Sequence, residues 1–134
     1  MIKITNLSKK YDDVYVLDKL CCNIKDNCIY GLIGANGAGK STLLRLINSI
    51  FKADSGTILV DGENVFENDK IKQKMVFISD DLFFYPSYTL MDTAKYYQAM
   101  YKDFDMNYLK ELADLFKLDL NKKISTFSKG MKRQ

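Results

Sequence analysis

The chain has 134 residues, which limits it to one domain but allows a sizeable hydrophobic core. Its composition, 47% hydrophobic and 28% charged, is typical of a soluble globular protein, and no apolar run reaches the length that spans a membrane. A net charge of +3 does not favour nucleic acid as a partner of the whole chain, and the first residues lack a secretory signal, so we expect a cytosolic protein.

Strands are predicted for most of the chain before position 34. Residues 1–7 alternate apolar and polar side chains, and 15–24 are rich in β-forming residues, with a turn expected at 18–19. Residues 28–33, CIYGLI, form a near-continuous apolar run, which is typical of a strand buried on both faces and flanked by parallel strands. The glycines that begin at Gly34 then interrupt this pattern.

The chain contains three cysteines, all within these strand-like stretches, and no histidine. A zinc site would therefore need at least one carboxylate ligand or a partner chain. We expect buried free thiols in a reducing compartment instead, at Cys21, Cys22 and Cys28.

A helix is predicted over 40–51, because apolar residues recur there on one helical face. Residues 53–65 indicate a turn, a strand and a second turn, with Gly56 and Gly62 interrupting the apolar pattern. Residues 75–79, MVFIS, predict another apolar strand. The apolar face of the predicted helix consists of Leu43, Leu44, Ile47, Ile50 and Phe51.

Two further helices are predicted after Pro86, so strands dominate the first part of the chain and helices the last. With the parallel sheet that 28–33 indicate, the expected fold class is α/β. Their apolar positions are Leu90, Ala94, Tyr97 and Tyr101 in one helix and Leu109, Leu112, Ala113 and Phe116 in the other. Residues 121–134 carry no acid, and their basic side chains form either a solvated face or a surface that faces an anion. These basic residues are Lys122, Lys123, Lys129, Lys132 and Arg133.

The stretch GLIGANGAGKSTLL contains Gly34-x-x-x-x-Gly39-Lys40-Ser41, which is the Walker A spacing. Glycines permit backbone conformations that residues with a Cβ avoid, so successive N–H groups can point into one concavity. That concavity opens onto the first turn of the predicted helix, where unpaired amides and the helix dipole favour a phosphate. Lys40 would reach the β- and γ-phosphates of ATP, and Ser41 would place its hydroxyl on Mg²⁺. A glycine turn that binds nothing is the alternative.

Three further features accompany this loop: Tyr11 before it, DSGTILVDG at 54–62 after the predicted helix, and FSKGMKRQ at 127–134 after two more helices. In this order the features closely resemble the nucleotide-binding domain of ABC transporters, over essentially the whole chain. The resemblance implies a P-loop NTPase core of the ABC type with an N-terminal antiparallel β subdomain and part of an α-helical subdomain. It places the β subdomain and P-loop core at about 1–80 and the helical subdomain at about 81–134, up to the signature sequence.

The resemblance also assigns roles to individual residues. Tyr11 matches the aromatic residue that stacks on adenine, with packing inside the sheet as the alternative, and Val16 is counted among the nucleotide contacts. Residues 127–131 match the signature sequence, in which Ser128 and Gly130 supply the hydroxyl and backbone amide that face a γ-phosphate. The expected nucleotide-binding residues are Tyr11, Val16, Gly34, Ala35, Asn36, Gly37, Ala38, Gly39, Lys40, Ser41 and Thr42, with Ser41 as the metal ligand, and the signature residues are Ser128, Lys129, Gly130 and Met131.

The sequence departs from the family pattern in two places. Asp80 stands where the family usually has the Q-loop glutamine, and its charge would repel phosphates unless a metal intervenes. Asp81 is an alternative match for that position, and a purely structural loop is another. Lys129 and Met131 replace the usual glycine and glutamine of the signature, a pattern that looks most like the ATPases of ABC-2-type exporters.

In this family the Walker B strand and the catalytic glutamate follow the signature, whereas the sequence ends at Gln134. We therefore expect a truncated portion of a longer ATPase that contains no catalytic residue, binds nucleotide weakly and hydrolyses it negligibly. The strand before the phosphate loop would lack its neighbours, so we also expect self-association through open strand edges or a rearranged sheet.

Taken as a whole, the resemblance implies the ATP-binding subunit of a bacterial ABC transporter, which binds ATP and Mg²⁺ to power export. It would lie at the inner face of the cell membrane, in a head-to-tail dimer with a second ATP-binding subunit and in contact with membrane permease subunits, and no nucleic acid is expected. The alternatives are a soluble ABC ATPase that acts on ribosomes or nucleic acid and a non-catalytic nucleotide-binding module. Aromatic residues that either line the permease groove or pack in the core are Phe83, Phe84, Tyr85 and Tyr88.

Overall fold

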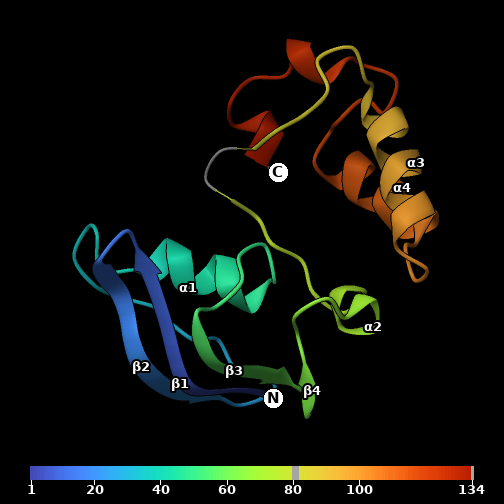
Figure 1. Ribbon diagram of the computed structural model, residues 1–134. Coiled ribbons are helices and arrows are strands. Elements are labelled where there is room, and N and C mark those ends of the chain that lie inside the picture. The colour runs from blue at the N-terminus through green and yellow to red at the C-terminus, as the bar shows by residue number, and fades with distance from the viewer. Residues whose placement is uncertain (80–81, 134) are drawn as a thin grey trace. The chain divides into compact units, whose positions relative to one another are not determined.

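The computed structural model describes residues 1–79 and 82–133. The chain divides into two compact units, Met1–Phe77 and Ile78–Gln134. The first unit holds a four-stranded sheet with a helix on one face, and the second unit is helical (Figure 1). Within the described residues, none of the helices has the length and apolar character that crossing a bilayer requires.

The sheet of the first unit is antiparallel throughout, with the strand order β2-β1-β3-β4. Tight turns join its hairpins, and the one between β3 and β4 has Asp61 at φ 51° and Gly62 at φ 82°. Two successive positive φ angles are what a two-residue hairpin turn requires, and Asp-Gly is a favoured pair for it. The strands are β1 (Ile2–Tyr11), β2 (Val14–Ile24), β3 (Ser55–Val60) and β4 (Glu63–Asn64).

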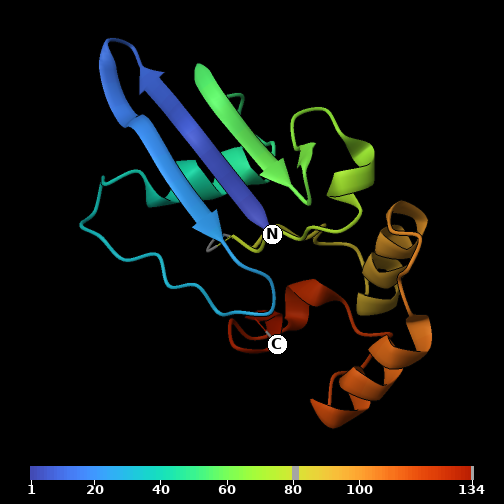
Figure 2. The same ribbon diagram turned by 90° about the horizontal axis from the view of Figure 1, so that it is seen from below.

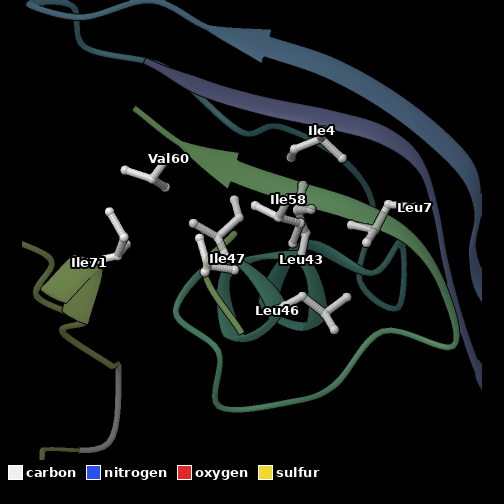
Figure 3. Close-up of a cluster of buried hydrophobic side chains, with 9 residues drawn as sticks. Ile4, Leu7, Leu43, Leu46, Ile47, Ile58, Val60 and Ile71 are labelled. Atoms are coloured by element: carbon white, nitrogen blue, oxygen red, sulfur yellow. The ribbon is translucent and has the colours of Figure 1, made fainter. Parts of the chain in front are cut away.

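The core of the first unit lies between this sheet and α1 (Lys40–Ile47), with α2 (Asp69–Lys72) at its margin. Figure 3 shows the side chains of the helix directed toward those of the strands. Burial of this cluster excludes water from one face of the sheet and holds the start of α1 in place. Its buried members are Ile4, Leu7, Leu43, Leu46, Ile47, Ile58, Val60, Val65 and Ile71.

The helix predicted over 40–51 is shorter than expected, because α1 ends at Ile47 and Ser49 takes a left-handed φ of 56°. A single residue in that conformation closes many helices. The predicted apolar face is also partly wrong, since Leu44 and Ile50 are 42% and 52% exposed while the unpredicted Leu46 is buried. The helical phase therefore differs from the one that the apolar pattern indicated.

The two apolar runs predicted as strands, 28–33 and 75–79, form no strand in the structure. Ile29 and Ile33 are 103% and 94% exposed, and Ile78 is 78% exposed. Figure 2 shows the long irregular path of the chain from β2 to α1. A strand is stable only when a neighbouring strand satisfies its backbone N–H and C=O groups, and the four-stranded sheet takes up neither run.

Two smaller predictions in the same region are also wrong. The turn expected at 18–19 lies inside β2, where Lys19 has φ 47° and donates its backbone N–H to the Ser8 hydroxyl at 2.9 Å, which makes it a bulge. The cysteines are free, as expected, but Cys21 and Cys28 are exposed rather than buried.

The second unit contains the two helices that the apolar periodicity predicted, and these predictions are confirmed. Thr89 and Asp105 cap their N-termini through side-chain oxygens that accept backbone N–H groups of the first turn. The segment 123–124 returns to the start of the first helix, where the Ile124 N–H donates to the Tyr88 carbonyl at 3.0 Å. The elements are α3 (Leu90–Met100), α4 (Met106–Leu115), η1 (Ile124–Thr126) and η2 (Met131–Arg133).

Candidate functional site

The glycine-rich loop of residues 34–39 leads into α1, and its last residue, Gly39, lies where no residue with a Cβ fits. Gly37 and Gly39 have φ angles of 84° and 83°, in the left-handed region that favours glycine. A Cβ on Gly39 would lie 2.9 Å from the Val16 carbonyl oxygen and 3.0 Å from a methyl carbon of the same residue. The contact with Val16 therefore requires glycine for space as well as for backbone conformation.

The start of α1 is open to an anion. Gly39 occupies the N-cap position without a side chain to cap the first turn, and that turn contains no acidic residue. The first N–H groups of a helix have no partner within the helix, and the helix dipole adds partial positive charge there. Lys40, Ser41 and Thr42 form this turn, and the Ser41 side chain is exposed.

Lys40 is folded back over the loop. Its ammonium group donates hydrogen bonds to the carbonyl oxygens of Gly34 and Ala35, both at 2.7 Å. These carbonyls hold a full positive charge beside the uncapped helix start, where it adds to the attraction for phosphate oxygens. The structure thus places the Lys40 ammonium against the loop at the uncapped helix start. The Ala38 N–H closes a turn onto the Ala35 carbonyl at 3.2 Å.

Tyr11, the predicted adenine-stacking residue, ends β1 and is 43% exposed. It pairs with Val14 across the hairpin, and Val16 lies two residues further along β2, against Gly39. This register places Tyr11 and Val16 in the same region of the first unit as the phosphate loop. An exposed ring at that place is available to stack on a flat ligand.

The Tyr11 ring has two neighbours that sequence reasoning did not connect with it. Phe51 meets it edge to face, with ring centroids 6.4 Å apart, and the Lys9 ammonium lies 5.7 Å from the Tyr11 centroid. Lys9 is paired with Asp54 at 3.1 Å, and Asp54 also accepts the Lys10 backbone N–H at 2.7 Å. The hydrogen bond from the Lys10 N–H, followed by the one from Lys9, holds the pKa of Asp54 below its usual range.

The signature residues lie in the second unit, where they form the start of a helical turn. The Ser128 hydroxyl accepts the Met131 N–H at 3.2 Å, and the Ser128 carbonyl accepts the Lys132 N–H at 3.0 Å. This is the hydrogen-bond pattern of a capping serine, and the single 3-10 turn η2 follows it. Phe127 is buried and anchors the turn, whereas Lys129 and Gly130 are exposed.

Two other predicted positions belong to the segment before α3. Asp80 and its alternative Asp81 lie outside the described residues.

The aromatic residues before α3 contact one another through their rings, with Tyr85 in the middle. The Tyr85 ring centroid lies 5.4 Å from that of Phe83 and 4.8 Å from that of Tyr88. Phe83 is 78% exposed, so packing in the core does not account for it.

Comparisons with known proteins agree on one family. Residues 17–134 match the family described as ABC transporter. The ABC transporter ATP-binding protein YtrB of Bacillus subtilis is 38% identical over 134 residues, which are all of this chain and 46% of YtrB. The bacitracin transport ATP-binding protein BcrA of Bacillus licheniformis is 33% identical over 137 residues, covering 100% of this chain and 45% of BcrA.

A solved structure, described as the ATP binding subunit of an ABC transporter, has the same fold, with a TM-score of 0.87 at 25% identity. The match covers 98% of this chain and 57% of that protein. The chain therefore belongs to the ABC transporter family of ATP-binding proteins. It spans about half the length of the curated relatives that it matches.

Proposed function

We propose that the chain binds ATP with Mg²⁺ through residues 34–42 and belongs to the ATP-binding subunit of a bacterial ABC transporter. One observation carries the proposal: the Lys40 ammonium is held by the carbonyls of the glycine loop at the uncapped start of α1. Backbone amides, a helix dipole and a fixed cation each favour a polyphosphate. The family to which the chain belongs binds ATP.

Each loop residue has a definite role in this proposal. Lys40 exchanges the carbonyl oxygens of Gly34 and Ala35 for oxygens of the β- and γ-phosphates, which attract the ammonium more strongly because they are charged. The Ser41 hydroxyl is exposed in the first turn of α1, where it is free to ligate Mg²⁺. The metal, when bound, neutralises charge between the β- and γ-phosphates. Tyr11 stacks on the adenine ring.

We further propose that the transporter is an exporter. BcrA and YtrB match this chain from end to end, and BcrA is named for bacitracin transport. The partners would be permease subunits in the membrane and a second ATP-binding subunit, placing the protein at the inner face of the membrane. The exposed Lys129 and Gly130, beside the capped turn at Ser128, would then face the nucleotide held by the second subunit.

A titration with a fluorescent ATP analogue in the presence of Mg²⁺ tests the binding step. We expect Lys40→Ala to weaken binding by about tenfold or more, because a charge-assisted hydrogen bond to phosphate is lost. Lys52→Ala is the matched control, since Lys52 lies in the same unit but contacts the Phe66 ring. Equal affinities for wild type, Lys40→Ala and Lys52→Ala would overturn the proposal.

A further inference from the structure

The orientation of the Tyr11 ring depends on two neighbours that come from different parts of the first unit. Phe51 contacts the ring in a T-shaped arrangement, and the Lys9 ammonium lies over it. An edge-to-face contact holds an aromatic ring at a set angle, because the positive edge of one ring points at the negative face of the other. A cation near the ring centroid is attracted to the π-system and favours the same ring position.

Phe51 is itself held firmly by the helix that begins at the phosphate loop. Its backbone N–H and that of Ile50 both donate to the Arg45 carbonyl, at 3.3 Å and 2.9 Å. The Arg45 guanidinium lies 5.6 Å from the Phe51 ring centroid, and the ring packs against the core cluster. Phe51 therefore connects the Tyr11 ring to α1, whose first turn forms the phosphate site.

Lys9 is also held in place, by an ion pair with Asp54. Its side chain is only 17% exposed, and its ammonium is paired with the Asp54 carboxylate at 3.1 Å. Asp54 is fixed in turn by the Lys10 N–H, and its own backbone N–H donates to the Ser8 carbonyl at 3.0 Å. The cation over Tyr11 is thus part of a network anchored in β1 and not a freely moving surface lysine.

We propose that Phe51, together with Lys9 held by Asp54, is a positioning set that orients Tyr11 for a purine base while α1 holds the phosphates. This inference rests on the proposed function and deepens it, because it explains how base and phosphate recognition are joined. The set acts through Tyr11 and does not touch the ligand. Losing Phe51 or Lys9 should therefore weaken recognition of the base and leave recognition of the phosphates unchanged.

The test compares two ligands that share phosphates but not a base: a fluorescent ATP analogue and inorganic tripolyphosphate, the latter measured by competition. The readout is the ratio of the two dissociation constants in the presence of Mg²⁺. We expect Phe51→Leu to reduce the preference for ATP over tripolyphosphate by about two- to tenfold. This factor corresponds to the free energy that one aromatic pair usually contributes. Phe66→Leu is the matched control, because Phe66 also lies under a lysine, Lys52, at 5.1 Å.

Lys9→Met gives a second measurement, because it removes the charge while keeping an unbranched side chain that is one atom shorter. We expect this variant also to reduce the preference for ATP over tripolyphosphate. In a Tyr11→Ala background, Phe51→Leu should have no further effect on the ratio. A general loss of folding would weaken both ligands equally and leave the ratio unchanged.

The outcomes separate the two proposals. If Phe51→Leu and Lys9→Met leave the ratio at the wild-type value while tripolyphosphate still binds, the positioning set is overturned and the phosphate site stands. If neither the ATP analogue nor tripolyphosphate binds to the wild-type chain, the proposed function is overturned, and the positioning set with it.

Discussion

Gly56 and Gly62 share a left-handed backbone, with φ angles of 84° and 82°, but their surroundings differ. Gly56 lies opposite the bulge in β1, and a Cβ there would come within 2.3 Å of the Asn6 carbonyl oxygen and 2.6 Å of the Leu7 Cα. A Cβ on Gly62 would meet nothing within 4 Å. A comparison of the two positions therefore separates two costs of adding a Cβ: backbone strain, which both positions share, and steric overlap, which only Gly56 has.

We expect Gly56→Ala to lower the free energy of unfolding of the first unit by more than about 2 kcal/mol, because backbone atoms of β1 must move. Gly62→Ala should cost only about 1 kcal/mol, the strain of a left-handed alanine. Urea unfolding monitored by amide hydrogen exchange in β1 and β3 measures both. Equal losses for the two variants would contradict the predicted overlap at Gly56.

At the scale of elements, α3 begins with a capping box. The Thr89 hydroxyl accepts the Asp92 N–H at 3.0 Å, and the Asp92 carboxylate accepts the Thr89 N–H at 3.0 Å and its hydroxyl at 2.7 Å. The box satisfies donors that the helix leaves unpaired at its N-terminus. The box fixes the start of α3 together with the backbone hydrogen bonds to the segment 120–124.

We expect Thr89→Ala to destabilise α3 by about 1 kcal/mol, the usual cost of losing an N-cap side chain. Thr93→Ala is the control: its hydroxyl bonds back to the Thr89 carbonyl at 3.1 Å within the helix, a contact that contributes little to helix stability. Hydrogen exchange of the α3 amides reports both variants. Comparable protection factors in Thr89→Ala and wild type would show that the box does not stabilise α3.

At the scale of the molecule, the two units each carry carboxylates that are ionised more readily in the folded state. In the first unit the Lys10 N–H and Lys9 lower the pKa of Asp54, and in the second the Thr89 N–H and hydroxyl lower the pKa of Asp92. Below the ordinary value of 3.8, the unfolded chain binds protons that the folded chain does not. The stabilisation is therefore complete above that value and is lost as the pH falls through the lowered pKa.

This predicts that acidification below pH 3.8 destabilises both units, each through its own carboxylate. Asp54→Asn should flatten the pH dependence of amide exchange in β1 and β3 and leave that of α3 unchanged. Asp92→Asn should flatten the pH dependence of amide exchange in α3 and leave that of β1 and β3 unchanged. A change in the exchange of both units with either variant would show that they do not respond to acid independently.

Local sequence was sufficient to predict the structure wherever neighbouring residues determine the backbone conformation. The Walker A spacing gave the loop and the helix start, Asp61 and Gly62 the hairpin turn, and the helical periodicity α3 and α4. These elements rest on hydrogen bonds and dihedral preferences over a few residues, which a sequence pattern can report. The roles of Tyr11, Val16 and the loop in binding stay predictions that the proposed titrations test.

Contacts between segments that are far apart in the sequence could not be predicted from local patterns in the same way. Whether 28–33 becomes a strand depends on which segment lies beside it, and the apolar pattern alone does not say. The meeting of Tyr11 with Phe51, and of Lys9 with Asp54, arises because β1, α1 and β3 pack around one core. Such contacts depend on the packing of whole elements, because residues far apart in the chain meet only when the core that separates or joins them has formed.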